Sequence, residues 1–389
     1  METEKLYYAD PFLTDFTATV LDCQPGKNGY LVTLDRTAFY PEGGGQPADH
    51  GVLDGAAVTD VHEKNGVILH NVDRAVEIGK TVTGAIDWER RFDHMQQHSG
   101  EHICSGLICQ RFHCDNVGFH MGADIVTIDF NADISWEELL EIEAKANQYL
   151  YENHPIDIQF HRGAELEAID YRSKKALEGD VRIVAFPGAD CCACCGTHVL
   201  RSGQVGLVKF LSVQKFREGV RIELLCGKRA LEYLSKTWEQ AKAIGQRLSV
   251  KPVDSEAAVE RLEGKLTSLK LRCTQLEESV FESIAKELAG KGDVMLFQPS
   301  MRPDSVRRLM DAVSKTCSGL AAVFSGEEGH YAYALGRADG QDISPLVKAM
   351  NTALHGRGGG RNGFAQGSVE TERSAIESFF KENGYGICD

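Results

Sequence analysis

Two pairs of metal-binding side chains, far apart in the sequence, constrain this chain more than any other feature. The first pair lies in a stretch with histidines at 94, 98 and 102. Successive histidines are four residues apart, so the pair is either His94 and His98 or His98 and His102. On a helix, side chains at this spacing stack on one face and can reach one ion. The second pair is Cys194 and His198. Three imidazoles and one thiolate suit Zn²⁺, so the chain is expected to fold around a zinc site.

Length and composition describe a multidomain protein of ordinary character. At 389 residues, with 42% hydrophobic and 25% charged side chains, the chain exceeds one typical core. No apolar run approaches the roughly 20 residues of a membrane span, and no secretory signal is visible at the N-terminus. Twelve cysteines, four of them close to a histidine, then favour metal binding and free thiols over disulfides. We expect a cytoplasmic protein without a membrane partner.

The charge balance argues against a general polyanion binder, since the formal net charge is −15. A local basic patch could still hold a nucleic acid, because a sum over the whole chain hides such a patch.

The pattern of elements predicts an α+β protein in four parts. Short β-branched runs separated by turn sequences predict a small β-barrel over 1–86. A zinc-binding α+β domain is expected over 87–227, a helical linker or coiled coil over 228–290, and an α/β domain over 291–389. In the second part, a helix is expected from Asp87 to about His113.

Further helices are expected at 135–152, where Ser135 begins a capping-box pattern, and at 165–177, where the chain is polar. Strand candidates at 156–162 and 182–186 flank the second of these helices.

Three successive glycines follow Thr37 and Glu42 and precede Gln46. Such a triplet is typical of a bend, but it also leaves backbone amides open to a ligand. The polar neighbours favour the second interpretation.

The linker carries apolar side chains at alternating steps of four and three, as in the seam of a coiled coil. These residues are Leu262, Leu266, Leu269, Cys273, Leu276 and Val280. The pattern fits a homodimer through the 258–284 helix, or a helix packed on its own domain. The C-terminal domain is a second candidate dimer contact.

Another glycine-rich segment, at 356–367, contains Arg357 and Arg361. Arginines among glycines can offer guanidinium groups and open amides to phosphates. The alternative is a flexible loop.

Four motifs together resemble one known family. They are Phe-Tyr-Pro-Glu-Gly-Gly-Gly-Gln-Pro at 39–47, His-Ser-Gly-Glu-His-Ile at 98–103, Cys-Cys-Gly-Thr-His-Val at 194–199 and Gly-Val-Arg-Ile-Glu at 219–223. In this order they resemble the editing half of alanyl-tRNA synthetase. They are more similar still to the free-standing AlaX editing proteins, in the long form with a C-terminal DHH-associated domain, which the 356–367 segment also resembles. With the β module at the first residues, the resemblance implies an editing factor without a ligase domain.

The resemblance implies a ligand set of His98, His102, Cys194 and His198, with His94 one turn outside it. The family motif has a glycine where this chain has Cys195. Cys191, Cys192 and Cys195 are therefore alternative ligands in place of Cys194.

The implied reaction is hydrolysis of the ester that joins serine, and perhaps glycine, to tRNA(Ala). A site built for alanine rejects an isostere with one extra hydroxyl by only about 10²-fold, so a second site must remove the error. Thr37 is the candidate for the serine hydroxyl contact, unless it is an ordinary strand threonine. Gln46, Gly44 and Gly45 are the candidates to orient the ester or a water.

Contacts to the tRNA are expected from Arg221, Arg357 and Arg361, by phosphate and shape. Whether zinc activates water or anchors the substrate is left open by the sequence. Three rival functions stand beside this one. They are a zinc-stabilised tRNA-binding protein without activity, an editor of Ser-tRNA(Thr), and a DHH-type phosphoesterase, although no Asp-His-His string is present.

Overall fold

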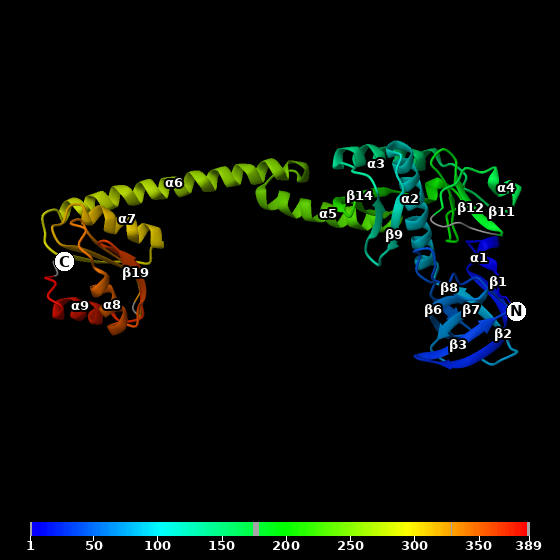
Figure 1. The fold of residues 1–389 in the computed structure, drawn as a ribbon, viewed down its shortest axis with the longest axis horizontal. Coiled ribbons are helices and arrows are strands. Elements are labelled where there is room, and N and C mark those ends of the chain that lie inside the picture. Colours follow the sequence, from blue (N-terminus) through cyan, green and yellow to red (C-terminus); the bar gives the residue numbers. More distant parts are fainter. Residues whose placement is uncertain (1, 174–178, 328, 387–389) are drawn as a thin grey trace. The chain divides into compact units, whose positions relative to one another are not determined.

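The computed structural model describes residues 2–173, 179–327 and 329–386 (Figure 1). It divides into two compact units, 1–243 and 244–389, which are described separately below. The mixed α+β class expected from the sequence is confirmed. The finer division into four parts stays a prediction. Among the described residues, no helix combines the length and the apolar character that crossing a membrane requires.

Six strands of the first unit form a closed barrel in the order β2-β3-β7-β6-β5-β8. Their bounds are β2 Asp15–Gly26, β3 Gly29–Leu34, β5 Gly51–Leu53, β6 Ala56–Lys64, β7 Val67–Val72 and β8 Thr81–Ile86. Buried side chains alternate along the first half of β2, where Phe16, Ala18 and Val20 point into the interior of the barrel. A short parallel pair, β1 Glu4–Lys5 and β4 Arg36–Thr37, accompanies the barrel together with α1 Leu6–Ala9.

Helix α2, Trp88–Phe112, follows the barrel and confirms the predicted helix. The Asp87 carboxylate accepts from the Arg90 amide at its N-terminus, and His113 ends it in the left-handed conformation (φ 51°). Fully buried Arg91 ties α2 to the barrel, since its guanidinium pairs with Asp49 and donates to two backbone carbonyls.

Two antiparallel sheets surround α2. The four-stranded sheet has the order β14-β15-β10-β9, and the three-stranded sheet has the order β11-β12-β13. Their bounds are β9 Asn116–Met121, β10 Val126–Phe130, β11 Asp157–His161, β12 Val181–Phe186, β13 Asp190–Ala193, β14 Val208–Phe216 and β15 Gly219–Cys226. Helix α3, Trp136–Glu152, begins with the predicted capping box at Ser135.

The predicted polar helix at 165–177 is wrong over 168–173, where the chain is not helical. Only α4, Ala164–Glu167, is helical in that range, and residues 174–178 lie outside the described part of the chain. None of the four residues of α4 is buried, so no apolar face packs to extend the helix.

Helix α5, Gly227–Leu248, and the 3₁₀ turn Pro252–Asp254 lead into the second unit. Its five-stranded sheet has the order β16-β17-β18-β20-β19. Bounds are α6 Ser255–Glu287, β16 Val294–Gln298, α7 Pro303–Ser314, β17 Leu320–Glu327, β18 His330–Arg337, α8 Ser344–Ala353, β19 Arg357–Arg361, β20 Phe364–Val369 and α9 Arg373–Glu382. The glycine-rich segment is therefore an antiparallel hairpin of β19 and β20, and not a flexible loop.

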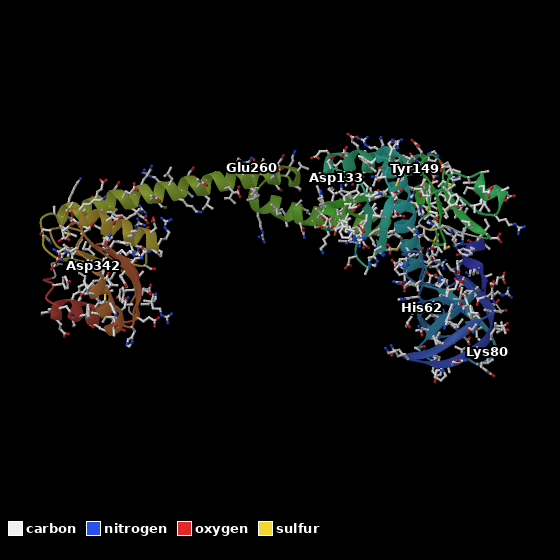
Figure 2. All side chains as sticks on the ribbon, in the orientation of Figure 1. His62, Lys80, Asp133, Tyr149, Glu260 and Asp342 are labelled. Carbon is white, nitrogen blue, oxygen red and sulfur yellow. The ribbon has the colours of Figure 1, made fainter. Side chains whose placement is uncertain are left out.

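Side chains project from both edges of α6 around Glu260 (Figure 2). The predicted seam lies along this helix. Its four leucines and Val280 are between 50% and 62% exposed, and Cys273 is also exposed. This seam is not packed against the described part of the chain.

Candidate metal centre

The structure brings together the four side chains His98, His102, Cys194 and His198. One ligand atom from each lies within 4.8 Å of all the others. The Cys194 sulfur is 3.5 Å from His98 Nε2 and 3.3 Å from His198 Nε2. With Zn–S bonds of about 2.3 Å and Zn–N bonds of about 2.0 Å, a tetrahedral site separates sulfur from nitrogen by ~3.5 Å. The donor set and its spacing therefore fit zinc.

Each imidazole is oriented through its other ring nitrogen. His98 Nδ1 lies 2.9 Å from Gln46 Oε1, and His102 Nδ1 lies 2.8 Å from Asp190 Oδ2. His198 Nδ1 lies 3.3 Å from the Ser99 hydroxyl. Such contacts fix the tautomer and leave Nε2 free for an ion.

The charges around the cluster also favour a cation. Burial alone would raise the pKa of the Cys194 thiol, but the imidazoles around it hold that pKa well below its usual range. Burial lowers the pKa of His198 to about 3. Burial would also lower the pKa of His102, yet the Cys194 charge and the Asp190 bond raise it well above its usual value. The thiolate and the carboxylate thus attract positive charge at His102, which a metal cation would supply.

A tight turn before the cluster carries Gln46. Residues Gly43 and Gln46 form a backbone bridge, with Gly44 and Gly45 between them at φ 60° and 87°. Glycine is required at position 45 for two reasons. Its φ is positive, and a side chain there would meet the Phe119 ring at 2.6 Å. Gln46 Oε1 also accepts from the Thr197 amide, and its Nε2 donates to the Thr197 hydroxyl at 2.8 Å. Gln46 therefore joins the turn to both halves of the cluster.

Comparison with known proteins identifies the family of the chain. Three family models match: class II (A) tRNA synthetases over 3–90, the second additional domain of threonyl and alanyl tRNA synthetases over 181–223, and the DHHA1 domain over 286–382. The chain is 30% identical to the alanyl-tRNA editing protein AlaX-L of Pyrococcus horikoshii, over 96% of each chain. The chain belongs to the AlaX-L family of alanyl-tRNA editing proteins.

Longer relatives contain the same region. The present chain is 32% identical to alanine–tRNA ligase of Pyrococcus abyssi over 98% of its own length, but it spans only 44% of that ligase. It is 34% identical to the ligase of Natronomonas pharaonis, and the match covers 94% of the present chain and 42% of the ligase.

Other predicted site residues of this AlaX-L chain lie outside the cluster. Thr37 is fully buried in the barrel, where its hydroxyl contacts His70 Nε2 at 2.9 Å and accepts from the Phe39 amide at 3.1 Å. His70 Nδ1 in turn lies 3.0 Å from the Val32 carbonyl oxygen. The hydroxyl hydrogen of Thr37 is thus engaged by His70, and the contact of Thr37 with a serine hydroxyl stays a prediction.

His94 also lies apart from the four-residue cluster. It is buried, Nδ1 is enclosed without a partner in the described part of the molecule, and burial with nearby Arg90 lowers its pKa to about 3. The alternative pair of His94 and His98 is therefore not the pair that meets Cys194. Among the alternative thiols, Cys192 forms a second group with His102 and Asp190, whereas Cys195 is exposed.

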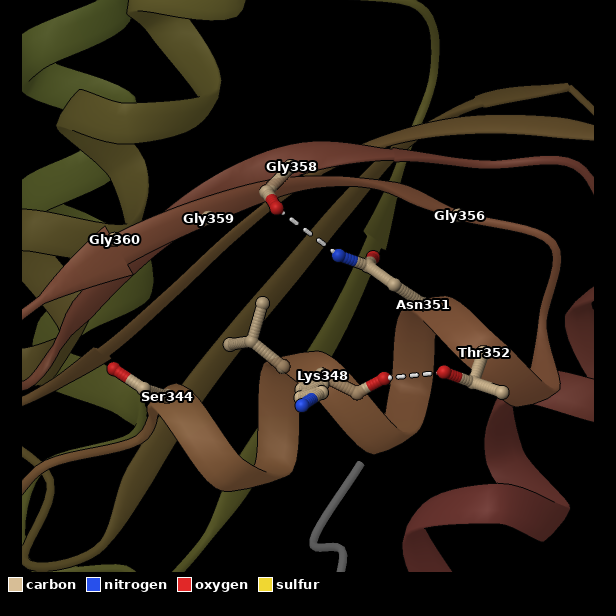
Figure 3. Close-up of a pocket in the computed structure, with 9 residues that line it drawn as sticks. Ser344, Lys348, Asn351, Thr352, Gly356, Gly358, Gly359 and Gly360 are labelled. Atoms are coloured by element: carbon tan, nitrogen blue, oxygen red, sulfur yellow. Dashed lines mark hydrogen bonds between the residues drawn. The ribbon is translucent and has the colours of Figure 1, made fainter.

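The predicted RNA-binding arginines differ in their surroundings. Arg221 forms a bidentate ion pair with Asp129 and lies over the Phe216 ring. Arg357 and Arg361 are exposed at the two ends of β19. Beside them, α8 and the glycines of β19 line a pocket of about 320 Å³, into which Lys348 and Ser344 contribute polar groups (Figure 3).

Several contacting residues were not predicted from the sequence. Asp190 and Ser99 contact the ligand side chains of His102 and His198, and Thr197 contacts Gln46. Arg172 pairs with Asp190 at 2.7 Å. The adjacency of Asp190 to the cysteine-rich turn was a usable signal, but Ser99 and Thr197 carried none beyond their place inside the motifs.

Proposed function

We propose that this chain hydrolyses the ester joining serine to tRNA(Ala), with glycine as a second amino acid, at a zinc ion. His98, His102, Cys194 and His198 would hold the ion. The observation that carries the proposal is the meeting of these four side chains, from two distant segments, in a chain of the AlaX-L family. The wider function, alanyl-tRNA editing, is that of the family.

Zinc would supply a Lewis acid that polarises the ester carbonyl or lowers the pKa of a water. The chain's own residues would do the positioning. Gln46 holds His98 and Thr197 in register, and the Gly44 and Gly45 amides lie in the same turn, where they can orient the ester or the water. Since four protein ligands complete a tetrahedron, this reaction needs room for a fifth ligand at the ion.

Selectivity against alanine would come from a polar contact to the serine hydroxyl. A site that must hydrogen-bond a hydroxyl rejects the analogue lacking it by roughly 10⁴–10⁵. We assign this contact to Thr37, which requires its hydroxyl to exchange the His70 bond for the substrate.

The tRNA would be held by Arg221, Arg357 and Arg361 and by the pocket beside β19. In the second unit, the exposed guanidinium groups of Arg357 and Arg361 and the glycine amides of β19 would bind phosphates as a local basic site on an acidic chain. Arg221, in the first unit, would be a separate contact. The protein would act in the cytoplasm, where its substrate is made.

A deacylation assay with zinc quantified tests the proposal. Ser-tRNA(Ala) should be hydrolysed fastest, Gly-tRNA(Ala) more slowly, and Ala-tRNA(Ala) and Ser-tRNA(Thr) hardly at all. His102→Ala should lose both zinc and activity, whereas the matched variant His94→Ala should keep the metal because His94 lies outside the cluster. Preferred hydrolysis of Ser-tRNA(Thr) would instead assign the chain to threonyl editing.

The completeness of the ligand set favours a second candidate, a zinc-stabilised tRNA-binding protein without activity. In that case zinc removal would lower the melting temperature and tRNA affinity, and no aminoacyl-tRNA would be hydrolysed by the zinc-loaded protein.

A further inference from the structure

Arg182, on β12, is a buried cation without an acidic partner. Its side chain is 5% exposed, and no carboxylate of the described residues forms an ion pair with it. The other buried arginine of the described residues differs, since Arg91 pairs with Asp49. Half-buried Arg172 also has an acidic partner, Asp190. Burying a guanidinium is costly unless its surroundings compensate the charge, so the position of Arg182 calls for an explanation.

The contacts of Arg182 converge on the turn that carries Cys194. Nη1 donates to the Cys194 carbonyl at 2.8 Å and to the Gly196 carbonyl at 2.9 Å. The Arg182 carbonyl accepts from the Cys194 amide at 3.1 Å. The guanidinium lies 5.0 Å from the centre of the Tyr8 ring, while Nε is enclosed without a partner.

In the turn that carries Cys194, two carbonyl groups face Arg182, and two amide groups face the metal cluster and Gln46. The carbonyls of Cys194 and Gly196 are held by Arg182, whereas the Gly196 amide donates to the Cys194 sulfur at 3.3 Å. The next amide, of Thr197, donates to Gln46 Oε1 at 3.0 Å. The Thr197 N–H shares a peptide plane with the Gly196 carbonyl, so holding that carbonyl toward Arg182 turns the N–H the opposite way, toward Gln46. The Gly196 N–H belongs to the plane between the two held carbonyls, so its orientation toward the sulfur is restricted from both sides.

We propose that Arg182 is a positioning residue for the metal centre. It fixes the 194–197 turn so that the Cys194 sulfur, supported by the Gly196 amide, faces the three imidazoles. The role rests on the proposed zinc site, but it concerns only residues of this chain. Losing a residue that orients a metal ligand typically costs 10–100-fold in metal affinity.

The test compares R182M and R182K with wild type and with the surface control R111M, whose arginine pairs with Glu141. Zinc affinity is measured by chelator competition, and Co²⁺ substitution reports the thiolate-to-metal charge-transfer band. We expect R182M to lose 10–100-fold in zinc affinity and to shift or weaken that band, R182K to fall between, and R111M to match wild type. An R182M protein with wild-type affinity and an unchanged band would overturn the proposal.

Folding is checked by circular dichroism on the metal-free proteins. Should R182M not fold, R182Q decides, because its shorter and uncharged side chain keeps a polar amide but cannot reach both carbonyls. A folded R182Q with wild-type affinity and band would then refute the role. If wild type itself binds neither Zn²⁺ nor Co²⁺, the proposed function fails first, and Arg182 has no metal centre to position.

Discussion

Gln46 shows how one side chain can connect distant parts of a site. Its amide oxygen contacts His98 and the Thr197 backbone, while its amide nitrogen reaches the Thr197 hydroxyl. An amide is suited to this place because it both donates and accepts, which neither a carboxylate nor an ammonium does.

Replacing Gln46 by Ala should therefore loosen His98 without removing a ligand. We expect zinc affinity or deacylation to fall 10–100-fold, the range for residues that orient metal ligands. Chelator competition and single-turnover hydrolysis of Ser-tRNA(Ala) measure this. Gln24→Ala, which removes a surface amide bound to Asp22, is the control and should change neither quantity.

His70 makes the barrel sensitive to acid. Burial lowers its pKa from 6.5 to about 4. Between these values the unfolded chain binds a proton that the folded chain does not, so stability is complete above the upper value and is lost as the pH falls toward the lower one. Since one pKa unit corresponds to about 1.4 kcal/mol, the loss of unfolding free energy is on the order of 3 kcal/mol.

The variant His70→Gln should flatten this part of the pH dependence. Urea unfolding of wild type and variant across the acidic range measures the difference in slope. His50 and His94, whose pKa values burial also lowers, remain in both proteins, so the slope should decrease and not vanish. Parallel curves for the two proteins would contradict the assignment.

Among the elements, the β19–β20 hairpin differs most from its sequence appearance. A run of glycines suggests a loop, yet β19 pairs with β20 in regular register. Glycine is needed at 358, where a side chain would meet the Gln366 carbonyl oxygen at 2.4 Å and the Tyr333 hydroxyl at 2.5 Å. The hairpin thus holds Arg357 and Arg361 on a rigid edge strand.

Removing both arginines should weaken tRNA binding while leaving the metal centre unchanged. The double variant Arg357→Ala and Arg361→Ala should bind less tightly and reduce the salt slope of log K by about 1–2, since each phosphate contact contributes somewhat under one. Filter binding across salt concentrations measures the slope. Arg74→Ala, an exposed arginine on Asp73, should leave it unchanged.

At the scale of the molecule, the exposed seam of α6 predicts self-association. Its leucines are at least half exposed, and they recur at the a and d positions of a heptad. This spacing is the pattern of a two-stranded coiled coil. We expect a homodimer in solution, which the double change Leu266→Glu and Leu269→Glu should convert to a monomer.

Sedimentation equilibrium measures that change. Ser268→Glu adds a charge on the same exposed helix, off the seam, and should leave the dimer intact. Because the leucines contact little of their own chain, the melting temperature of the dissociated protein should hardly change. A monomeric wild-type protein would show that the seam serves another purpose.

The sequence by itself determined the features that depend on local spacing. His98 and His102 share a helix face because they are four residues apart, and Asp87 caps that helix because an aspartate stands before its first turn. The short alternating runs of the first 86 residues likewise predicted strands, because period two is a property of the chain itself.

Tertiary structure decided which distant groups meet. Pairing of β12 with β13 and the side chain of Arg182 hold the Cys194 turn, which contacts α2 through His98 and Ser99. No local pattern encodes that approach. Long-range packing likewise places His94 outside the cluster and Thr37 against His70. In the second unit, pairing with β20 makes the glycine run at 357–361 a strand. Residue spacing fixes which side chains share a face, but only long-range packing fixes which faces touch.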